Sequence, residues 1–441
     1  MGSDLAVAHS GTDPRGNADL NTPPRHQIAV VGCGTGGPAV ALLLARIGHD
    51  VTVFERVAEP GPVGAGILMQ PTGMTVLARL GLLDRLLDAG ARIDQLWGET
   101  PSGRLVLNIA YADYHADPSN RPEVFGLGLH RGVLFAHLFA ALQRERIPVR
   151  CGVSVESIRQ VEAGKSVLID SNGNEHGPYS LVIVADGARS ELRAATDLTK
   201  KVTRCPWGAL WAIVPNSDNL FPQTLFQIYA GTKRFTGFLP TGRGVDSDDP
   251  LISIFWSIRL NQVDRWRERD IGRWKDEVLS IAPQVESLLG HITSHDQLAV
   301  ATYHDVQMRT WNTDHVVYLG DAAHAMSPQL GQGANLALVD AAALADCVAA
   351  DPANLATALN NYSRQRRANL CYYQFASRWL TPLFQSSLTP LSWPRDFIFE
   401  PFARLRFFKK QMVDVLVGAK TGLFATRPQE QVLGFQQQQH K

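Results

Sequence analysis

The clearest pattern of apolar positions in the chain lies between residues 27 and 56. Ile28–Val31 is an apolar run of the kind that forms a buried parallel strand, and Val51–Phe54 is a second such run. Between them, Pro38–Ile47 has the composition of a helix that ends at Gly48. Strand, helix and strand in this order predict one βαβ unit of a parallel sheet.

Three glycines follow the first of these strands in G-x-G-x-x-G spacing. Gly32 allows a tight turn, Gly34 lets a pyrophosphate approach the backbone, and Gly37 lets the helix pack on the strand. The helix N-terminus offers free N–H groups and partial positive charge, and Glu55, followed by Arg56, can accept hydrogen bonds from a ribose. The combination predicts a dinucleotide site; the alternative is a glycine-rich turn without a ligand.

Two further stretches each allow a ligand or a structural interpretation. The Gly/Pro-rich segment 60–66, which ends at Gly66, can lie against a flat ligand or be an ordinary surface loop. Arg131 precedes the predicted helix Val133–Gln143, where it can reach a phosphate or remain a surface side chain.

A second signature follows another buried strand, Ser180–Ala185. The strand ends in Asp186 and Gly187, at the position where α/β sheets place ligands, although an Asp-Gly pair alone is usually a turn. Ser190 is a candidate N-cap for the next helix.

A third signature lies between the strand Val316–Leu319 and the apolar helix Leu336–Ala350. Asp321 is placed to accept a hydrogen bond from a ribose or ribitol hydroxyl, and Pro328 offers a rigid wall beside a planar ring. Gly331 and Gly333 let backbone N–H groups approach closely, and the positive end of the helix faces them. A site that stabilises an anionic ring would have these features.

Helical periodicity gives way to alternation between Thr203 and about Leu260. Trp207 and Trp211 share one face, while Ile252 and Trp256 share another, which predicts long antiparallel strands. The expected fold class is α/β (α+β overall): a Rossmann-like cofactor domain, an inserted antiparallel-sheet substrate domain and a C-terminal helical region. The expected boundaries are a disordered leader at 1–26, the cofactor domain at 27–195 with a short β excursion at about 92–124, the sheet domain mainly at 196–295, the rest of the cofactor domain at 296–370, C-terminal helices at 371–425 and a disordered tail at 426–441.

The C-terminal region is helical in pattern and rich in charge. Helices are expected from Ala353 to Phe384, with Arg364, Arg366 and Arg367 on a solvated face. Residues 395–417 mix aromatic with basic side chains, a composition that suits a membrane surface. Such a segment more often closes a pocket or forms a subunit contact, which is the interpretation favoured here.

Composition limits the classes of function. Lys+Arg and Asp+Glu both number 42 in 441 residues, so the net charge is zero, which argues against a nucleic-acid partner. The five cysteines are scattered without a C-x-x-C pair, which argues against a disulfide framework and against a zinc site. Unpaired cysteines suit a reducing compartment, so a cytoplasmic location is expected. No metal-ligand cluster is found in the sequence. No signal peptide and no apolar run of about 18 residues is found, so a membrane span is not expected.

The three signatures together resemble the single-component, FAD-dependent aromatic hydroxylases, the family of para-hydroxybenzoate hydroxylase and the ubiquinone-biosynthesis hydroxylases. The resemblance covers about residues 27–370. It implies bound FAD and transient NADH or NADPH, with Asp186 and Gly187 tied to both. The residues that the motifs and the resemblance together lead us to expect at the cofactor are Gly32, Gly34, Gly37, Glu55, Arg56, Gly66, Arg131, Asp186, Gly187, Gly320, Asp321, Pro328, Gly331, Gly333, Ala334 and Asn335.

The resemblance also implies a reaction. NAD(P)H reduces FAD, oxygen adds to the reduced ring, and a flavin hydroperoxide hydroxylates an aromatic or polycyclic small molecule while the protein excludes water. Tyr229, His304 and Arg259 are candidates for a base near a phenolic substrate, but nothing selects one of them and each can be structural, so the catalytic residue is unknown. The alternatives are a flavin-dependent halogenase fed by a separate reductase, for which Trp207–Pro215 is a loose motif, and a redox-silent FAD-binding protein.

Overall fold

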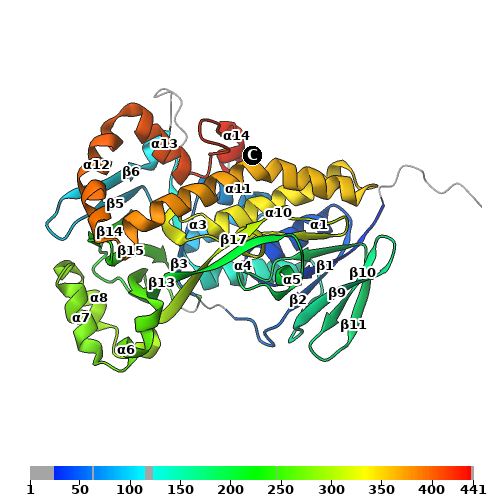
Figure 1. Ribbon diagram of the computed structural model, residues 1–441, viewed down its shortest axis with the longest axis horizontal. Coiled ribbons are helices and arrows are strands. Elements are labelled where there is room, and N and C mark those ends of the chain that lie inside the picture. Colours follow the sequence, from blue (N-terminus) through cyan, green and yellow to red (C-terminus); the bar gives the residue numbers. More distant parts are fainter. Residues whose placement is uncertain (1–23, 62–63, 115–122, 246, 439–441) are drawn as a thin grey trace, which may run out of the picture.

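The computed structural model describes residues 24–61, 64–114, 123–245 and 247–438. It consists of two main sheets, with helices covering both and one long helix crossing above them (Figure 1). Most of the predicted leader, residues 1–23, lies outside the described residues.

The first sheet is parallel and is built around β1. Its strand order is β18-β12-β1-β2-β8. The three signatures follow β1, β12 and β18, which are neighbours in this order, so the carboxyl ends of these strands bring the signatures to one edge of the sheet. The strands are β1 (Gln27–Val31), β2 (Asp50–Glu55), β8 (Val149–Cys151), β12 (Leu181–Val184) and β18 (Val316–Tyr318).

The second sheet has seven strands, and all neighbours in it except β14 and β5 are antiparallel. It confirms the predicted inserted sheet, and it also recruits β5, β6 and β17 from outside residues 196–295. In spatial order the strands are β17 (Ala299–Met308), β13 (Thr199–Pro215), β16 (Leu251–Arg259), β15 (Arg234–Gly242), β14 (Thr224–Ala230), β5 (Gln95–Glu99) and β6 (Leu105–Ala110).

Two three-stranded sheets complete the β structure. One has the order β3-β7-β4, with β3 (Gly66–Met69), β4 (Ala91–Ile93) and β7 (Gly126–His130). The other has the order β11-β10-β9, with β9 (Val155–Glu162), β10 (Lys165–Asp170) and β11 (Glu175–Tyr179). Strand β3 begins with Gly66, and β7 leads directly into the helix that starts at Arg131, so these small strands carry two of the candidate residues.

The helices fall into three groups. The cofactor side has α1 (Gly36–Arg46), α2 (Pro71–Arg79), α3 (Leu83–Ala89), α4 (Arg131–Arg144), α5 (Glu191–Ala194), α9 (Asp321–His324) and α10 (Gly333–Ala350). One face of the large sheet packs on α6 (Val263–Arg267), α7 (Ile271–Leu279) and α8 (Glu286–Gly290) through a separate core. The C-terminal group is α11 (Leu355–Phe384), α12 (Ser392–Arg404), α13 (Arg406–Leu416), α14 (Gln429–Val432) and α15 (Gly434–Gln438).

Helix α10 is apolar because it is a core helix. Among the described residues it is the one helix long and apolar enough to cross a membrane, and 67% of it is buried inside the molecule. It packs against α1, α2 and α11.

Two expectations about the C-terminal third were wrong. Arg366 does not share the solvated face of Arg364 and Arg367: its side chain is 1% exposed and pairs with the buried Asp340. The segment from residue 426 is not a disordered tail throughout, because Phe435 is 1% exposed and α15 packs against α2. The buried apolar residues of this segment, Val432, Leu433 and Phe435, stand among many glutamines, so its composition did not predict that it packs on the rest of the protein.

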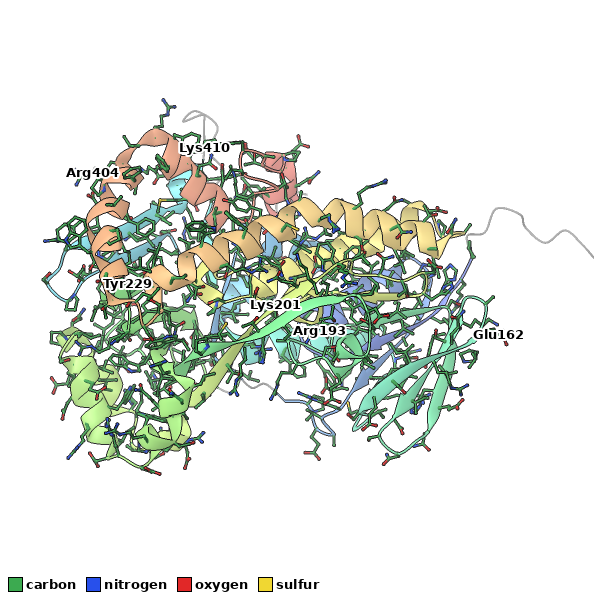
Figure 2. All side chains as sticks on the ribbon, in the orientation of Figure 1. Glu162, Arg193, Lys201, Tyr229, Arg404 and Lys410 are labelled. Carbon is green, nitrogen blue, oxygen red and sulfur yellow. The ribbon has the colours of Figure 1, made fainter. Side chains whose placement is uncertain are left out.

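The aromatic and basic segment 395–417 forms most of α12 and all of α13. Phe399 and Met412 line a cavity that lies between the two main sheets, which agrees with the interpretation that this segment closes a pocket. Other aromatic side chains of the segment, including Phe407, are exposed. Arg404 and Lys410 lie on the outer side of these helices (Figure 2).

Candidate functional site

One cavity of about 660 Å³ lies between the signature edge of the parallel sheet and the seven-stranded sheet. One part of its wall carries the glycine-rich motifs, and the other carries apolar and aromatic side chains. The predicted cofactor residues that line it are Gly34, Gly66, Arg131, Gly187, Gly320, Asp321, Pro328, Gly331, Gly333 and Ala334.

The first signature is held together by close backbone contacts. Gly32 has φ +107°, and a Cβ there would lie 2.4 Å from the carbonyl oxygen of Ala185. A Cβ on Gly37 would lie 1.9 Å from the carbonyl oxygen of Gly32. Gly34 differs, because beyond its chain neighbours none of the described residues has an atom within 4 Å of its Cβ position, and the residue lines the cavity. Gly32 and Gly37 therefore shape the turn, and Gly34 leaves room for a ligand beside the N-terminus of α1.

Glu55 is fixed at the end of β2 by two backbone N–H groups. Its Oε2 accepts a hydrogen bond from Cys33 at 2.8 Å and its Oε1 accepts one from Val57 at 3.0 Å. Each carboxylate oxygen can accept a further hydrogen bond, so contact with a ribose remains open to it. Neither Glu55 nor Arg56 lines the cavity.

The second signature is tied to the third by Arg193, a role that sequence reasoning missed. Its guanidinium donates to the carbonyl oxygens of Ala322 and Ala188, each at 2.9 Å. Ser190 caps α5 by accepting the N–H of Arg193 at 3.0 Å, which confirms the predicted cap. Oδ1 of Asp186 is buried without a hydrogen-bond partner among the described residues, and burial raises the pKa of this carboxyl above its usual range. A hydroxyl donor from a ligand would satisfy that oxygen.

The third signature rests on a buried carboxylate. Oδ2 of Asp340 accepts the backbone N–H of Gly320 at 3.0 Å and contacts Nε2 of His324 at 2.5 Å, while Oδ1 accepts Nε–H of Arg366 at 2.7 Å. Burial alone would raise the pKa of Asp340, but the neighbouring His324 and Arg366 lower it to about 2. The ionised Asp340 thus fixes the turn that presents Asp321 at the cavity.

Asn335 lies behind the cavity wall and does not line it. Its Nδ2 donates to the carbonyl oxygens of Leu68 and Gly331, at 3.1 and 3.2 Å, and its Oδ1 accepts the N–H of Gln70 at 2.8 Å. These bonds join β3 to the turn at Gly331, whose φ of +60° suits glycine. Asn335 therefore positions the segment that carries Pro328 and Gly331.

The residues present fit a dinucleotide cofactor: an open glycine beside a helix N-terminus, a buried unpaired carboxylate oxygen and a continuous cavity. Individual FAD contacts of the lining residues stay predictions. The same holds for the predicted residues that do not line the cavity: Gly32, Gly37, Glu55, Arg56, Asp186 and Asn335.

Of the three candidate bases, the structure brings only Tyr229 to the cavity. Arg259 packs over the ring of Trp207 at 5.8 Å, and neither it nor His304 lines the cavity. Tyr303 and Gln227 also line it and were missed. The period-two alternation of β14 offered a signal for Gln227, since it places residues 225, 227 and 229 on one face.

The site and fold define a flavoprotein, and sequence comparison identifies its family. A profile of the FAD binding domain matches residues 25–370, so the chain belongs to this family. The chain is 28% identical to a probable 2-heptyl-3-hydroxy-4(1H)-quinolone synthase of Rhodococcus erythropolis, over 77% of this chain and 84% of the relative. It is 26% identical to 6-hydroxynicotinate 3-monooxygenase of Pseudomonas fluorescens, over 78% of this chain and 88% of that relative. It is 28% identical to 3-hydroxybenzoate 6-hydroxylase of Klebsiella oxytoca, over 76% of this chain and 83% of that relative.

Solved structures share the fold. The Klebsiella pneumoniae protein HpxO, in complex with FAD and uric acid, superposes with a TM-score of 0.74 at 20% identity, covering 91% of this chain and 99% of HpxO. The tetrameric form of 2-methyl-3-hydroxypyridine-5-carboxylic acid oxygenase gives a TM-score of 0.68 at 20% identity, covering 85% and 97%.

The family and its named relatives confirm the resemblance seen in the sequence. The chain is an FAD-dependent enzyme of the monooxygenase and hydroxylase kind. The halogenase alternative is not favoured, because these relatives are named as monooxygenases and hydroxylases.

Proposed function

We propose that the protein uses NADH or NADPH and molecular oxygen to hydroxylate an aromatic or polycyclic small molecule. The observation that carries the proposal is the single cavity whose wall combines the cofactor motifs with the apolar face of the second sheet. A substrate in the sheet part of this cavity lies next to the cofactor part without crossing solvent.

The residues have distinct roles in this proposal. The turn at Gly34 and the N-terminus of α1 would hold the FAD pyrophosphate, Arg131 would add a positive charge there, and Asp321 would accept a hydrogen bond from the ribitol. Backbone N–H groups from Gly331 to Ala334, at the start of α10, line the cavity and would favour negative charge on a flavin ring bound there. When bound, FAD supplies the redox chemistry with NAD(P)H and oxygen.

The apolar part of the wall excludes water from the reacting centre, which protects oxygen transfer from hydrolytic side reactions. The relatives' names support an aromatic substrate: a quinolone, a hydroxynicotinate and a hydroxybenzoate. The cytoplasmic location remains a prediction.

The test is NADH and NADPH oxidation in air by the purified, FAD-loaded protein, with and without a panel of phenols and polycyclic aromatics. We expect one compound to accelerate oxidation and to gain an atom of ¹⁸O from ¹⁸O₂. A protein that holds FAD but is reduced by neither nicotinamide would contradict the proposal and point to a separate reductase. A protein that takes up no FAD would also contradict it.

A further inference from the structure

The substrate part of the cavity is built without charge. Of the described residues that line the whole cavity, Arg131 and Asp321 are the charged ones, and both belong to the cofactor part. All seven strands of the second sheet contribute to the remaining wall. Their lining side chains are Leu96, Leu107, Ile109, Ala209, Trp211, Leu225, Gln227, Tyr229, Phe235, Leu239, Phe255, Ser257 and Tyr303.

Six aromatic rings run through this part of the wall in unbroken succession, and we refer to them as the aromatic wall. Four consecutive pairs have ring centroids 5.0 Å apart, and the fifth pair is 5.8 Å apart, which is the range of favourable ring contacts. In order they are Trp211, Phe255, Phe235, Tyr229, Phe384 and Phe399. In Figure 2, Tyr229 lies between the sheet and the C-terminal helices.

Arg395, a buried cation beside the aromatic wall, is already neutralised. Arg395 packs 5.0 Å from the ring centroid of Tyr229 without lining the cavity. Its guanidinium donates to Asp396 at 2.6 Å and to the carbonyl oxygens of Gly231 and Leu383 at 2.9 and 3.0 Å. A substrate carboxylate in this part of the cavity would therefore lose its hydration without gaining a cation.

Two polar side chains in the substrate part keep a hydrogen-bond donor that has no partner among the described residues. The hydroxyl of Tyr303 accepts Nε1–H of Trp211 at 3.2 Å, so its own hydrogen is available. Burial raises the pKa of Tyr303 to about 12, so the hydroxyl stays protonated at neutral pH. Oε1 of Gln227, a residue that lines the cavity, accepts the hydroxyl hydrogen of Tyr229 at 2.6 Å, and the Gln227 amide N–H groups have no hydrogen-bond partner among the described residues.

We propose that this site selects an uncharged, extended aromatic substrate. The substrate packs on the aromatic wall, and a hydroxyl or carbonyl oxygen attached to its ring system accepts a hydrogen bond from Tyr303. The class comprises fused-ring phenols and ring ketones, and it excludes the corresponding aromatic carboxylates. The inference rests on the proposed function, because it concerns the substrate of that same site.

The first test measures binding without NAD(P)H, so its result does not depend on turnover. FAD-loaded protein is titrated with 2-naphthol and with 6-hydroxy-2-naphthoate, and Kd is taken from the change in flavin absorbance or tryptophan fluorescence. These probes share one ring system and differ by a carboxylate. We expect 2-naphthol to bind at least about tenfold more tightly. Equal or tighter binding of the carboxylate, or binding of neither probe, would overturn the proposal.

Two variants separate the parts of the proposal. Tyr303→Phe should weaken 2-naphthol about fivefold or more and leave naphthalene, which has no oxygen, unchanged. Equal loss for both ligands would show a packing effect and refute the role of the hydroxyl. Gln227→Arg places a cation in the wall and should raise the affinity for 6-hydroxy-2-naphthoate; an unchanged preference would refute the argument from charge. Retained FAD absorbance in each variant confirms a folded site, and failure of the proposed function would appear separately, as absent nicotinamide oxidation.

Discussion

The carboxylate of Asp340 accepts the backbone N–H of Gly320 at 3.0 Å, across the turn that begins the third cofactor motif. Asp340 itself is fully buried in α10 and does not line the cavity. Asp340 holds the turn at Gly320 in place without lining the cavity. We therefore expect it to affect FAD binding by positioning the third motif.

Asp340→Asn should lower the free energy of unfolding by about 3 kcal/mol, because it leaves the buried Arg366 without its counter-charge. FAD affinity should fall with it, since the turn at Gly320 loses its anchor. Chemical denaturation and FAD titration measure the two effects. The matched control is Asp346→Asn on the same helix, where the pair with Arg79 is exposed and a change below about 1 kcal/mol is expected. Similar losses in both variants would refute the anchoring role.

The lowered pKa of the Asp340 carboxyl predicts that the free energy of unfolding depends on pH in the acid range. Because the pKa of Asp340 is about 2 in the folded protein, against an ordinary aspartate value of 3.8, its ionised form stabilises the fold above about pH 4. That stabilisation is lost as the pH falls from about 4 toward 2. The difference in unfolding free energy between the native protein and Asp340→Asn should therefore shrink as the pH falls below about 4. A difference that grows in acid would contradict this sign.

Two glycines of the first motif should give opposite phenotypes. Gly37→Ala should destabilise the apoprotein, because its Cβ would lie 1.9 Å from the carbonyl oxygen of Gly32. Gly34→Ala meets no protein atom within 4 Å, so the apoprotein should keep its unfolding free energy within about 1 kcal/mol. Its methyl group enters the cofactor part of the cavity, and FAD affinity should fall about tenfold or more. Thermal unfolding of the apoprotein and FAD titration separate the two; normal FAD binding by Gly34→Ala would exclude the proposed placement of the pyrophosphate.

Arg131 at the start of α4 offers a test of phosphate binding. Arg131→Gln removes one charge-assisted donor, which corresponds to a loss of about 10- to 100-fold in FAD affinity. Arg144→Gln at the other end of the same helix is the control and should bind FAD normally. The Arg131 effect should also diminish at high salt, and a salt-independent loss would indicate a structural role instead.

Local patterns in the sequence predicted the parallel sheet, its three motifs and the inserted antiparallel sheet. β1, β12 and β18 are short apolar runs, and a glycine or an aspartate follows each within two residues. Because these strands are neighbours in the sheet, they bring the motifs together. The link between Gly320, Asp340 and Arg366 escaped notice because its members lie on three separate elements. Arg366 sits among other arginines in a helix that looks solvated, and only the packing of α11 on α10 shows that it is buried.

The substrate part of the site was predictable as a sheet and not as a cavity. Alternation placed Trp211 on one face of its strand, but the neighbours of that face come from distant segments. Phe384 and Phe399 belong to helices beyond the inserted sheet, and no local pattern connects them to Trp211. The absence of charge among the described residues that line the substrate part of the cavity became visible only once those segments were assembled.

The position of Arg366 has a consequence for biosynthesis. The ribosome releases the three cofactor motifs before it releases α11, so a nascent chain that ends near residue 350 contains every motif but lacks the guanidinium that neutralises Asp340. In that chain the carboxylate behind the third motif would have to be buried without Arg366, which is unfavourable. Capture of FAD is thus expected to be a late event, after α11 has emerged and docked on α10.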